Sequence, residues 1–349
     1  MKWNGVMSKL VKLSGFIADE KLEGSGLLGV LCFFKDGYVY GSNGVFEFEL
    51  YCGVDFDGVV SASKFYDVVR VLDPRVSYGV SVSDGNLVIR SDETEVKISM
   101  IEADGKVNRI VCLLSSEEGV KEGVEVNWRE EIVKVLRREG KIALSESSSA
   151  EYKVICFAKD GVYATDRVRI ACYFMPFLVG EERVLLLSVD GVKRLVEVMG
   201  DERVVGAWVV KGKLYVKFDG EFYVGVLGYD ISYPDLKSVL LGYKKKVKRF
   251  AVDMVVMGEV DKIVKILDTS DVVHLVLEDR WLELRVKSAR GFEWRKKLQK
   301  VDIDRDYAVG VLARDLDGVI DDVVELGLSD EVIYCRSVEG VEYVVATIS

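Results

Sequence analysis

The segment Lys159–Tyr173, KDGVYATDRVRIACY, brings together residue types that could carry acid–base chemistry or bind an anion. Asp166 follows Thr165 at the end of one apolar run, and Arg167 and Arg169 begin the next. A carboxylate at such a corner could act as a general acid. We favour a turn former instead, whose side chain accepts backbone N–H groups. The two arginines, set in an otherwise apolar run, fit either a ligand site or packing.

Other signatures of catalysis are missing from the sequence. His274 is the single histidine and lies in an alternating run, DVVHLVLED, which favours an ordinary strand residue without a catalytic partner. The chain contains no Gly-x-Gly-x-x-Gly, P-loop, Gly-x-Ser-x-Gly or His-Glu-x-x-His pattern. We therefore predict no catalytic residue, no metal and no cofactor, and we expect that the protein is not an enzyme.

Cysteine use and hydropathy predict a cytoplasmic protein. The cysteines are scattered and form no Cys-x-x-Cys pair, which favours reduced core residues over disulfides or zinc ligands. They are Cys32, Cys52, Cys112, Cys156, Cys172 and Cys335. No apolar run reaches the roughly 18 residues of a membrane-spanning helix, and the first residues lack the apolar core of a secretion signal. We expect no membrane partner.

The 349-residue chain repeats itself, and the repeats supply the elements that must position the corner. Three segments predict an opening helix: VMSKLVKLSGFI, NWREEIVKVLRRE and DMVVMGEVDKIVKIL. Three predict a second helix: VSASKFYDVVRVLD, LSVDGVKRLVEVMGD and LARDLDGVIDDVVEL. Three predict a hairpin: DGNLVIRSDETEVKISMI, KGKLYVKFDGEFYVGVL and SDEVIYCRSVEGVEYVVATI. Lys-Asp-Gly recurs at 35–37 and 159–161 and predicts a further, structural turn.

These copies, each of roughly 115–125 residues, predict three domains at 1–118, 119–243 and 244–349. Each domain would be a β-sheet with two helices on one face, so the predicted fold class is α+β. The joins fall in polar or charged stretches, LSSEEGVKEG and GYKKKVK. Duplication accounts for the apolar positions and by itself gives no function.

Cations gather on the predicted helices although the net charge is −10. Their spacing of three or four residues places them on one helical face, where they could follow a phosphate backbone. The set is Lys9, Lys12, Lys64, Arg70, Lys134, Arg137, Arg138, Lys193, Arg194, Lys262 and Lys265. The alternative is a solvated face, since carboxylates such as Asp67 and Glu197 share these helices. Charge alone leaves both interpretations open.

Three motifs, in this order, resemble the bacterial-type DNA sliding clamp, the beta subunit of DNA polymerase III. VYATDRVRIACY resembles that family's Ala-Thr-Asp-Gly-x-Arg-Leu-Ala corner in its middle domain. YDISYPDLKSVLL resembles its Gly-x-(Tyr/Phe)-Pro-Asp-Tyr segment, and VEYVVATIS resembles its final strand. The resemblance spans essentially the whole chain and is that of a divergent clamp, such as a viral one.

The resemblance implies a closed ring, in which two three-domain chains join head to tail around double-stranded DNA, with helices inside and sheets outside. It implies a processivity factor near the nucleoid, with a DNA polymerase and a clamp loader ATPase as partners. Such a ring contacts DNA loosely and without sequence preference. The alternative is a clamp-fold interaction scaffold that does not encircle DNA.

The resemblance also implies a cleft for partner peptides, with an apolar floor. The matching positions are Thr165, Arg167, Val168, Arg169, Ile170, Pro234, Ser238, Val239, Val344, Val345 and Ala346. Arg169 matches the family's cleft arginine. Arg167 and Val168 stand where the family usually has Gly and a variable residue, and the chain ends ATIS in place of a Met-Pro-rich tail.

The subunit interface implied by the resemblance joins the edge of the first domain to the third domain of the other copy. The matching apolar positions are Val96 and Ile98 on one side and Ile266 and Leu267 on the other. An apolar strand edge can serve either an interface or a core, and the sequence leaves both uses open for these four residues.

Overall fold

The computed structural model describes residues 3, 6–18, 31–102, 124–126, 128, 131–143, 149–175, 177, 184–200, 202–210, 212–288, 290–291, 293–303 and 305–348. The chain forms two compact units. The first unit comprises residues 1–128, 179–181 and 190–230, and the second comprises residues 129–178, 182–189 and 231–349. Each unit is described separately below.

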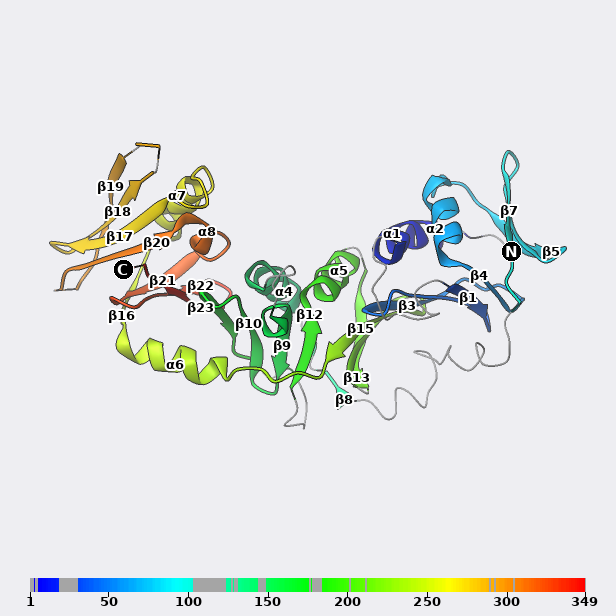
Figure 1. Cartoon of the computed structure of the whole chain (residues 1–349), viewed down its shortest axis with the longest axis horizontal. Helices are drawn as coiled ribbons and strands as arrows, with labels where there is room; N and C mark the ends of the chain where they lie inside the picture. The colour runs from blue at the N-terminus through cyan, green and yellow to red at the C-terminus, as the bar shows by residue number, and fades with distance from the viewer. Residues whose placement is uncertain are drawn as a thin grey trace. The chain divides into compact units, whose positions relative to one another are not determined.

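The first unit contains an antiparallel sheet in the order β4-β1-β2-β3-β15-β14-β13-β8. Its strands are β1 (Leu31–Lys35), β2 (Tyr38–Ser42), β3 (Phe46–Tyr51), β4 (Gly58–Ser61), β8 (Val124–Glu125), β13 (Val204–Val210), β14 (Lys213–Phe218) and β15 (Phe222–Tyr229). The helices α1 (Val6–Ala18) and α2 (Ala62–Val71) lie together on one face of strands β1–β4 (Figure 1). A smaller sheet holds β5 (Gly79–Ser83), β6 (Asn86–Arg90) and β7 (Glu95–Ser99), and α5 spans Val189–Met199.

The second unit contains a sheet in the order β12-β9-β10-β11-β23-β22-β21-β16 and another in the order β19-β18-β17-β20. The first holds β9 (Val154–Ala158), β10 (Gly161–Thr165), β11 (Arg169–Tyr173), β12 (Leu185–Ser188), β16 (Lys248–Ala251), β21 (Val323–Leu328), β22 (Val332–Ser337) and β23 (Glu342–Ala346). The second holds β17 (Val272–Glu278), β18 (Trp281–Lys287), β19 (Glu293–Lys300) and β20 (Tyr307–Leu312). The helices are α4 (Glu131–Ile142), α6 (Leu236–Lys246), α7 (Met254–Val264) and α8 (Ala313–Leu316).

The repeated pattern of helices and hairpins is confirmed. The three opening helices are α1, α4 and α7, and the three predicted hairpins are β6–β7, β14–β15 and β22–β23. Both Lys-Asp-Gly sequences lie at two-residue hairpin turns, but the turns use different residues. Asp36 and Gly37 connect β1 to β2, whereas Lys159 and Asp160 connect β9 to β10. The predicted join at residues 114–123 lies outside the described residues, and the one at 242–248 falls on the end of α6.

The predicted second helix of the third repeat is mostly wrong. The segment LARDLDGVIDDVVEL forms only the single turn of α8, and β21 already begins at Val323. Gly318 has a φ of +73°, a left-handed conformation that ends a helix and that glycine adopts without steric cost. Val319 and Ile320, which fit a helical pattern, are fully buried beyond that turn. These two apolar residues are buried by an irregular segment, and their spacing in the sequence happens to match that of a helix.

The predicted core cysteines are confirmed where they are described. Cys32, Cys52, Cys156, Cys172 and Cys335 are all buried and free, and Cys112 lies outside the described residues. Burial raises the pKa of the Cys52 thiol to about 12, which keeps it protonated and unreactive. Among the helices of the described ranges, none is both long and apolar enough to cross a membrane.

The sheet of the first unit approaches its helices closely at Gly41 on β2. A Cβ atom there would lie 2.1 Å from the Tyr66 hydroxyl oxygen and 2.6 Å from Cε1 of Phe48. Tyr66, on α2, and Phe48, on β3, are both buried aromatic residues of the core. Glycine at this position therefore sets the distance between α2 and the sheet.

We predict that Gly41→Ala destabilises the protein by about 1–3 kcal/mol, because overpacking forces two buried rings to move. The measurement is the free energy of unfolding in urea. Gly258→Ala in α7 is the matched control, since no atom lies within 4 Å of its added Cβ. We expect this control to stabilise the protein by up to about 1 kcal/mol. Equal effects of the two substitutions would contradict the packing at Gly41.

Candidate protein-interaction site

The corner between β10 and β11 is built around the carboxylate of Asp166. Its Oδ1 accepts hydrogen bonds from the backbone N–H groups of Val168 (3.0 Å) and Arg169 (2.6 Å). The Thr165 hydroxyl closes the turn by donating to the Arg169 carbonyl oxygen at 2.8 Å. These contacts confirm Asp166 as a turn former, because both lone-pair directions of Oδ1 serve the backbone.

Arg169 is a buried packing residue that connects β11 to α8. It is 7% exposed, and its Nε donates to Oδ2 of Asp166 at 2.7 Å. Its Nη1 donates to the carbonyl oxygens of Arg314 (3.3 Å) and Asp317 (3.2 Å), where α8 ends. Helix C-terminal carbonyls have no partner within the helix, so a guanidinium there satisfies them. Burial also raises the pKa of nearby Asp315, although Arg314 and Arg169 oppose that shift.

Strand alternation places the predicted cleft residues on two opposite faces of one sheet. Thr165 pairs with Ile170, and Ile170 pairs with Val344 across β11 and β23, so these three share a face. Arg169 pairs with Val345, which is fully buried, and these two share the other face. The structure therefore separates Arg169 from Ile170, although they are neighbours in sequence.

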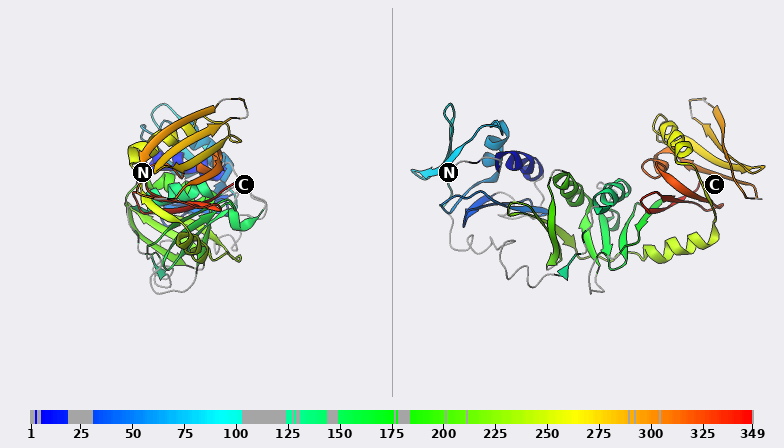
Figure 2. Two further views of the ribbon diagram at one scale, coloured as in Figure 1. Left: turned by 90° about the vertical axis from the view of Figure 1, so that its left-hand side faces the viewer. Right: turned by 180° about the vertical axis from the view of Figure 1, so that it is seen from behind.

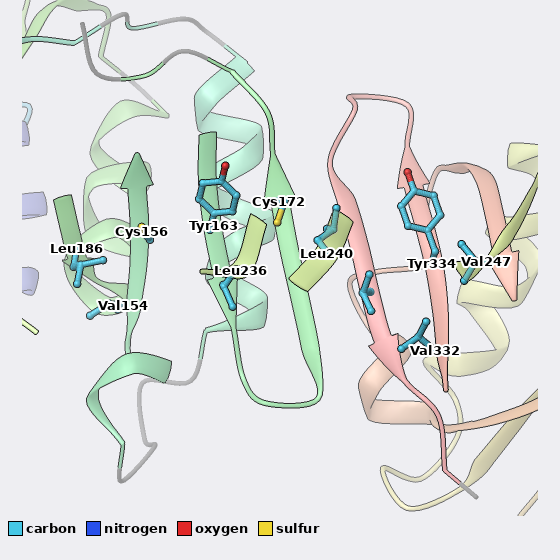
Figure 3. Close-up of a cluster of buried hydrophobic side chains, with 11 residues drawn as sticks. Val154, Cys156, Tyr163, Cys172, Leu186, Leu236, Leu240, Val247, Val332 and Tyr334 are labelled. Carbon is cyan, nitrogen blue, oxygen red and sulfur yellow. The ribbon is translucent and has the colours of Figure 1, made fainter. Parts of the chain in front are cut away.

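Helix α6 covers the face that carries Ile170 and Val344, and α4 lies on the opposite side of the sheet (Figures 1 and 2). Leu236 and Leu240 of α6 are buried among side chains of the strands, such as Cys172 and Val332 (Figure 3). Val344 belongs to the same buried cluster, and Ile170 packs against it. Val239 lies on the outer side of α6 and is 41% exposed. The accessible apolar groups here are therefore Val239, part of Ile170, and the half-buried end of β23.

The start of α6 is fixed by the segment around Pro234. Asp235 caps the helix by accepting a hydrogen bond from the Ser238 N–H at 3.0 Å. The Tyr233 hydroxyl donates to the Tyr163 carbonyl oxygen at 3.4 Å, which ties the segment to β10. Pro234 and Ser238, both predicted cleft residues, are exposed on this capping turn.

A cavity of about 500 Å³ opens beside this capping turn, and only Pro234 among the predicted cleft residues lines it. Its walls include Ala158, Tyr163 and Leu236, and an ion pair between Lys237 and Asp160 lies at its rim. Sequence analysis missed this cavity. Its only sequence signal is the extended Tyr-Pro-Asp stretch ahead of a helix, which leaves room between that stretch and the strands.

Arg167 differs from Arg169 in its exposure, its backbone conformation and the contacts of its guanidinium. It is exposed, and its φ of +85° is left-handed, which is uncommon for any residue with a Cβ. Its guanidinium carbon lies 4.9 Å from the centre of the Tyr152 ring, and Nη2 donates to the Ser149 hydroxyl at 3.2 Å. Tyr152 belongs to a short 3₁₀ helix, Ala150–Tyr152, which sequence analysis missed.

The predicted DNA-facing cations fall into two groups. Those that are exposed are Lys64, Arg70, Lys134, Arg137, Lys193, Lys262 and Lys265, whereas Lys9, Lys12, Arg138 and Arg194 are half-buried. Arg138 forms ion pairs with Asp322 and Glu339, and Lys9 with Glu202 at 3.0 Å. Arg138 and Lys9 therefore neutralise carboxylates of the chain itself, as does the exposed Lys265 with Asp261 at 2.6 Å. The other exposed cations are the better candidates for contact with a phosphate backbone.

The predicted interface residues also lie in different surroundings. Val96 and Ile98 are on β7, where Ile98 is only 3% exposed and Val96 is half-buried. Ile266 follows α7 and is 80% exposed, and Leu267 beside it is half-buried. Ile98 thus contributes to the core of its own sheet. Ile266 is the residue of this set whose apolar side chain is most exposed.

His274 is an ordinary strand residue, as predicted. It lies on β17 opposite Gly310 of β20 and is half-buried. Burial lowers its pKa, and the nearby cations Arg285 and Lys287 lower it further. The imidazole is therefore neutral at pH 7.

The chain has the fold of bacterial sliding clamps over its full length. The DNA polymerase III subunit beta of Pseudomonas aeruginosa matches with a TM-score of 0.77 at 14% identity, covering 100% of this chain and 98% of that one. Caulobacter crescentus pol III beta gives 0.78 at 17% identity, with 100% and 99% covered. The Helicobacter pylori beta clamp bound to a DNA ligase peptide gives 0.77 at 15% identity, with 100% and 99% covered. No protein-family model and no curated protein sequence matches the chain.

The predicted α+β clamp fold is therefore confirmed. The similarity of structure at such low identity agrees with a divergent clamp. The division into three domains, the individual site residues and the closed ring remain predictions.

We predict that Arg169→Ala lowers the free energy of unfolding by about 3 kcal/mol, because it leaves Asp166 and two α8 carbonyls without their buried donor. Urea titration measures the loss. Arg314→Ala is the control, since its side chain is 58% exposed and its one ion pair within the described ranges is with Asp315 at 3.5 Å. We expect that variant to stay within about 0.5 kcal/mol of the unmodified protein. A similarly small effect for Arg169→Ala would refute its packing role.

Proposed function

We propose that this protein is a DNA sliding clamp, a homodimeric ring that encircles duplex DNA and tethers a polymerase and other replication proteins. The observation that carries the proposal is a pair of strand edges left over by the internal repeat. The last strand of the second repeat, β15, pairs with β3 of the first, and the last strand of the third, β23, pairs with β11 of the second. In both cases the last strand of one repeat pairs with the third strand of a meander in the repeat before it, β1–β2–β3 or β9–β10–β11. By the same pattern, β7, the last strand of the first repeat, would pair with β19, the third strand of the meander β17–β18–β19 of the third repeat, in another copy of the chain.

These two edges lie on the same chain but can be joined between copies. In the described ranges, β7 pairs only with β6, and β19 pairs only with β18. Exposed edges present unpaired backbone groups that attract another strand. A head-to-tail pair of chains would satisfy both edges twice and so close a ring. Three predicted domains per chain give six around the hole.

The charges of the two edges are complementary. The β19 strand, EWRKKLQK, carries four cations and one carboxylate, whereas the segment DETEVK that leads into and along β7 carries three carboxylates before its lysine. Opposite charges across an interface speed association and fix the register. They also disfavour β7 pairing with β7 and β19 with β19, which supports head-to-tail closure.

The exposed helix cations would face the DNA. Residues such as Lys64 on α2, Lys134 and Arg137 on α4, and Lys193 on α5 can contact phosphates without reading bases. A topological link needs only loose contacts, so a chain with net charge −10 can still serve. A clamp held in this way raises the local concentration of a polymerase bound to it. Its ring would need a clamp loader ATPase to open it.

The partner site would lie on the accessible apolar surface formed by Ile170, Val239 and the end of β23. An extended peptide could place apolar side chains there while its polar atoms remain in water. The H. pylori clamp, whose structure carries a DNA ligase peptide, is similar over the full chain, which supports this assignment. We leave Arg169 and Val345 out of the proposed surface, because both are buried and lie on the opposite face of the sheet.

A clamp-fold scaffold that does not encircle DNA is the second candidate. It is favoured by an acidic segment of the third repeat, where Asp315 and Asp317 lie at α8 and Asp321 follows. Arg138 and Lys9 are also engaged by carboxylates of the same chain. The two candidates differ in whether the protein stays on closed circular DNA.

We predict a particle of about twice 39.1 kDa in solution. Ile266→Asp should shift it towards one-chain mass, because a charge would be buried in the interface. Val71→Asp is a matched control, since Val71 is 81% exposed and Ile266 is 80% exposed. Light scattering after size exclusion measures both. A one-chain mass for the unmodified protein at micromolar concentration would refute the dimeric ring.

We also predict that protein loaded on nicked circular DNA remains bound and is released when the circle is cut. The reason is that a ring is linked topologically and can slide off only at an end. Gel filtration of the DNA with and without a restriction cut measures retention. Equal loss from circular and linear DNA would favour the scaffold.

A further inference from the structure

The two arginines of the corner face different partners. Arg169 is buried and is held by Asp166 on the face of α4 and α8. Arg167 is exposed, and among the described residues its guanidinium forms an ion pair with no carboxylate. The chain carries ten more negative than positive charges, yet no carboxylate of the described residues pairs with this guanidinium.

The guanidinium is held in place although no carboxylate of the described residues pairs with it. The ring of Tyr152 lies under one face of it, and the Ser149 hydroxyl accepts one N–H. A stacked guanidinium keeps most of its five N–H donors at the edge of its plane, where they match the two oxygens of a carboxylate. Because its rotamer freedom is already reduced, less entropy is lost when an anion binds.

The backbone beneath Arg167 is strained. Its φ of +85° is a conformation that glycine adopts freely, and for other residues a left-handed conformation costs about 1–2 kcal/mol. A strained residue persists where the surrounding structure requires it, and such residues cluster at ligand clamps. The side chain of Arg167 therefore occupies a position where glycine would be more stable for the fold.

Arg167 also lies beside the accessible apolar surface. The corner joins Thr165 to the Ile170–Val344 pair, and the carbonyl oxygen of Val168 accepts the N–H of Ala346 at the end of β23. A chain that contacts Ile170 and this end of β23 therefore passes the residue next to Val168. The backbone at Arg167 is thus close to the end of β23 that belongs to the accessible apolar surface of the second unit.

We propose that the Arg167–Tyr152 pair recognises a carboxylate on the partner peptide, so that this clamp selects peptides with an acidic residue next to their apolar anchors. The inference rests on the proposed function, because it names the chemistry of the peptide that the cleft accepts. Arg167 supplies a bidentate donor to the aspartate or glutamate side chain, and Tyr152 positions the guanidinium. Ile170, Val239 and Ala346 at the half-buried end of β23 receive the apolar side chains.

The strain at residue 167 can be measured separately from binding. Arg167→Gly loses the contact with Tyr152 but relieves the backbone, whereas Arg167→Ala loses the contact and keeps the strain. We expect Arg167→Gly to be more stable than Arg167→Ala by about 1 kcal/mol in urea unfolding. Equal stabilities would show that the left-handed conformation is not strained, which would remove one support of the proposal.

The decisive test uses labelled hexapeptides with two leucines, glycine spacers and one aspartate placed at each remaining position in turn. A second set carries asparagine in place of aspartate. Fluorescence anisotropy with the full chain should find at least one aspartate peptide that binds about fivefold more tightly than its asparagine counterpart. Arg167→Ala should abolish that preference, and Arg167→Lys should keep part of it, because lysine retains the charge but not the planar fork.

Arg305→Ala is the matched control, because Arg305 also stacks on a tyrosine, with its guanidinium carbon 5.0 Å from the Tyr307 ring centre. It should keep the preference for aspartate. Peptides that bind without such a preference would overturn this inference and leave the cleft standing. If no peptide of either set bound, the cleft and the inference would both fall. Weaker retention of Arg167→Ala on circular DNA, with peptide binding unchanged, would assign Arg167 to phosphate and overturn the inference.

Discussion

The constraint on which this structure depends is that antiparallel strands need partners on both edges. One sheet of the first unit continues from β3 to β15, and one sheet of the second continues from β11 to β23. In both places, strands from different repeats meet and their backbone groups pair. The repeats are therefore joined by hydrogen-bonded backbone, which is far less sensitive to side-chain identity than a packed interface. This explains how a clamp fold survives at 13–17% identity to its structural neighbours.

Side-chain alternation is the second constraint, and it decides the chemistry of the corner. A strand sends neighbouring residues to opposite faces, so the side chains of Arg169 and Ile170 lie on opposite faces of the sheet. The family resemblance assigns both to a cleft, which remains a prediction, because a motif records the order of residues and not the direction of their side chains. The pairing of Arg169 with Val345, and of Ile170 with Val344, separates packing from the accessible surface.

The sequence predicted helices and strands correctly where the spacing of apolar residues reflected regular secondary structure alone. The opening helices, the hairpins and the role of Asp166 followed from local spacing and turn chemistry. The second helix of the third repeat failed because Val319 and Ile320 are buried by tertiary packing in an irregular turn. The carboxylate partners of Lys9 and Arg138 could not be predicted either, since Glu202 and Asp322 lie more than 180 residues away along the chain. The stacking of Arg167 on Tyr152 could not be predicted either, because the short 3₁₀ helix that carries Tyr152 had no recognisable pattern in the sequence.

The Asp166 turn connects these points, since one carboxylate sets the direction of both arginines. By accepting the N–H groups of Val168 and Arg169, it closes a tight corner in which residue 167 has a positive φ. Its second oxygen holds the Arg169 guanidinium towards α8. The strain of the turn thus falls on Arg167, which is directed to solvent and the Tyr152 ring, while the buried Arg169 is held by a carboxylate and by backbone carbonyl oxygens. Glycine at 167 would remove the strain and the cation together, so the residue at this position distinguishes a corner that only turns the chain from one that also presents a charge.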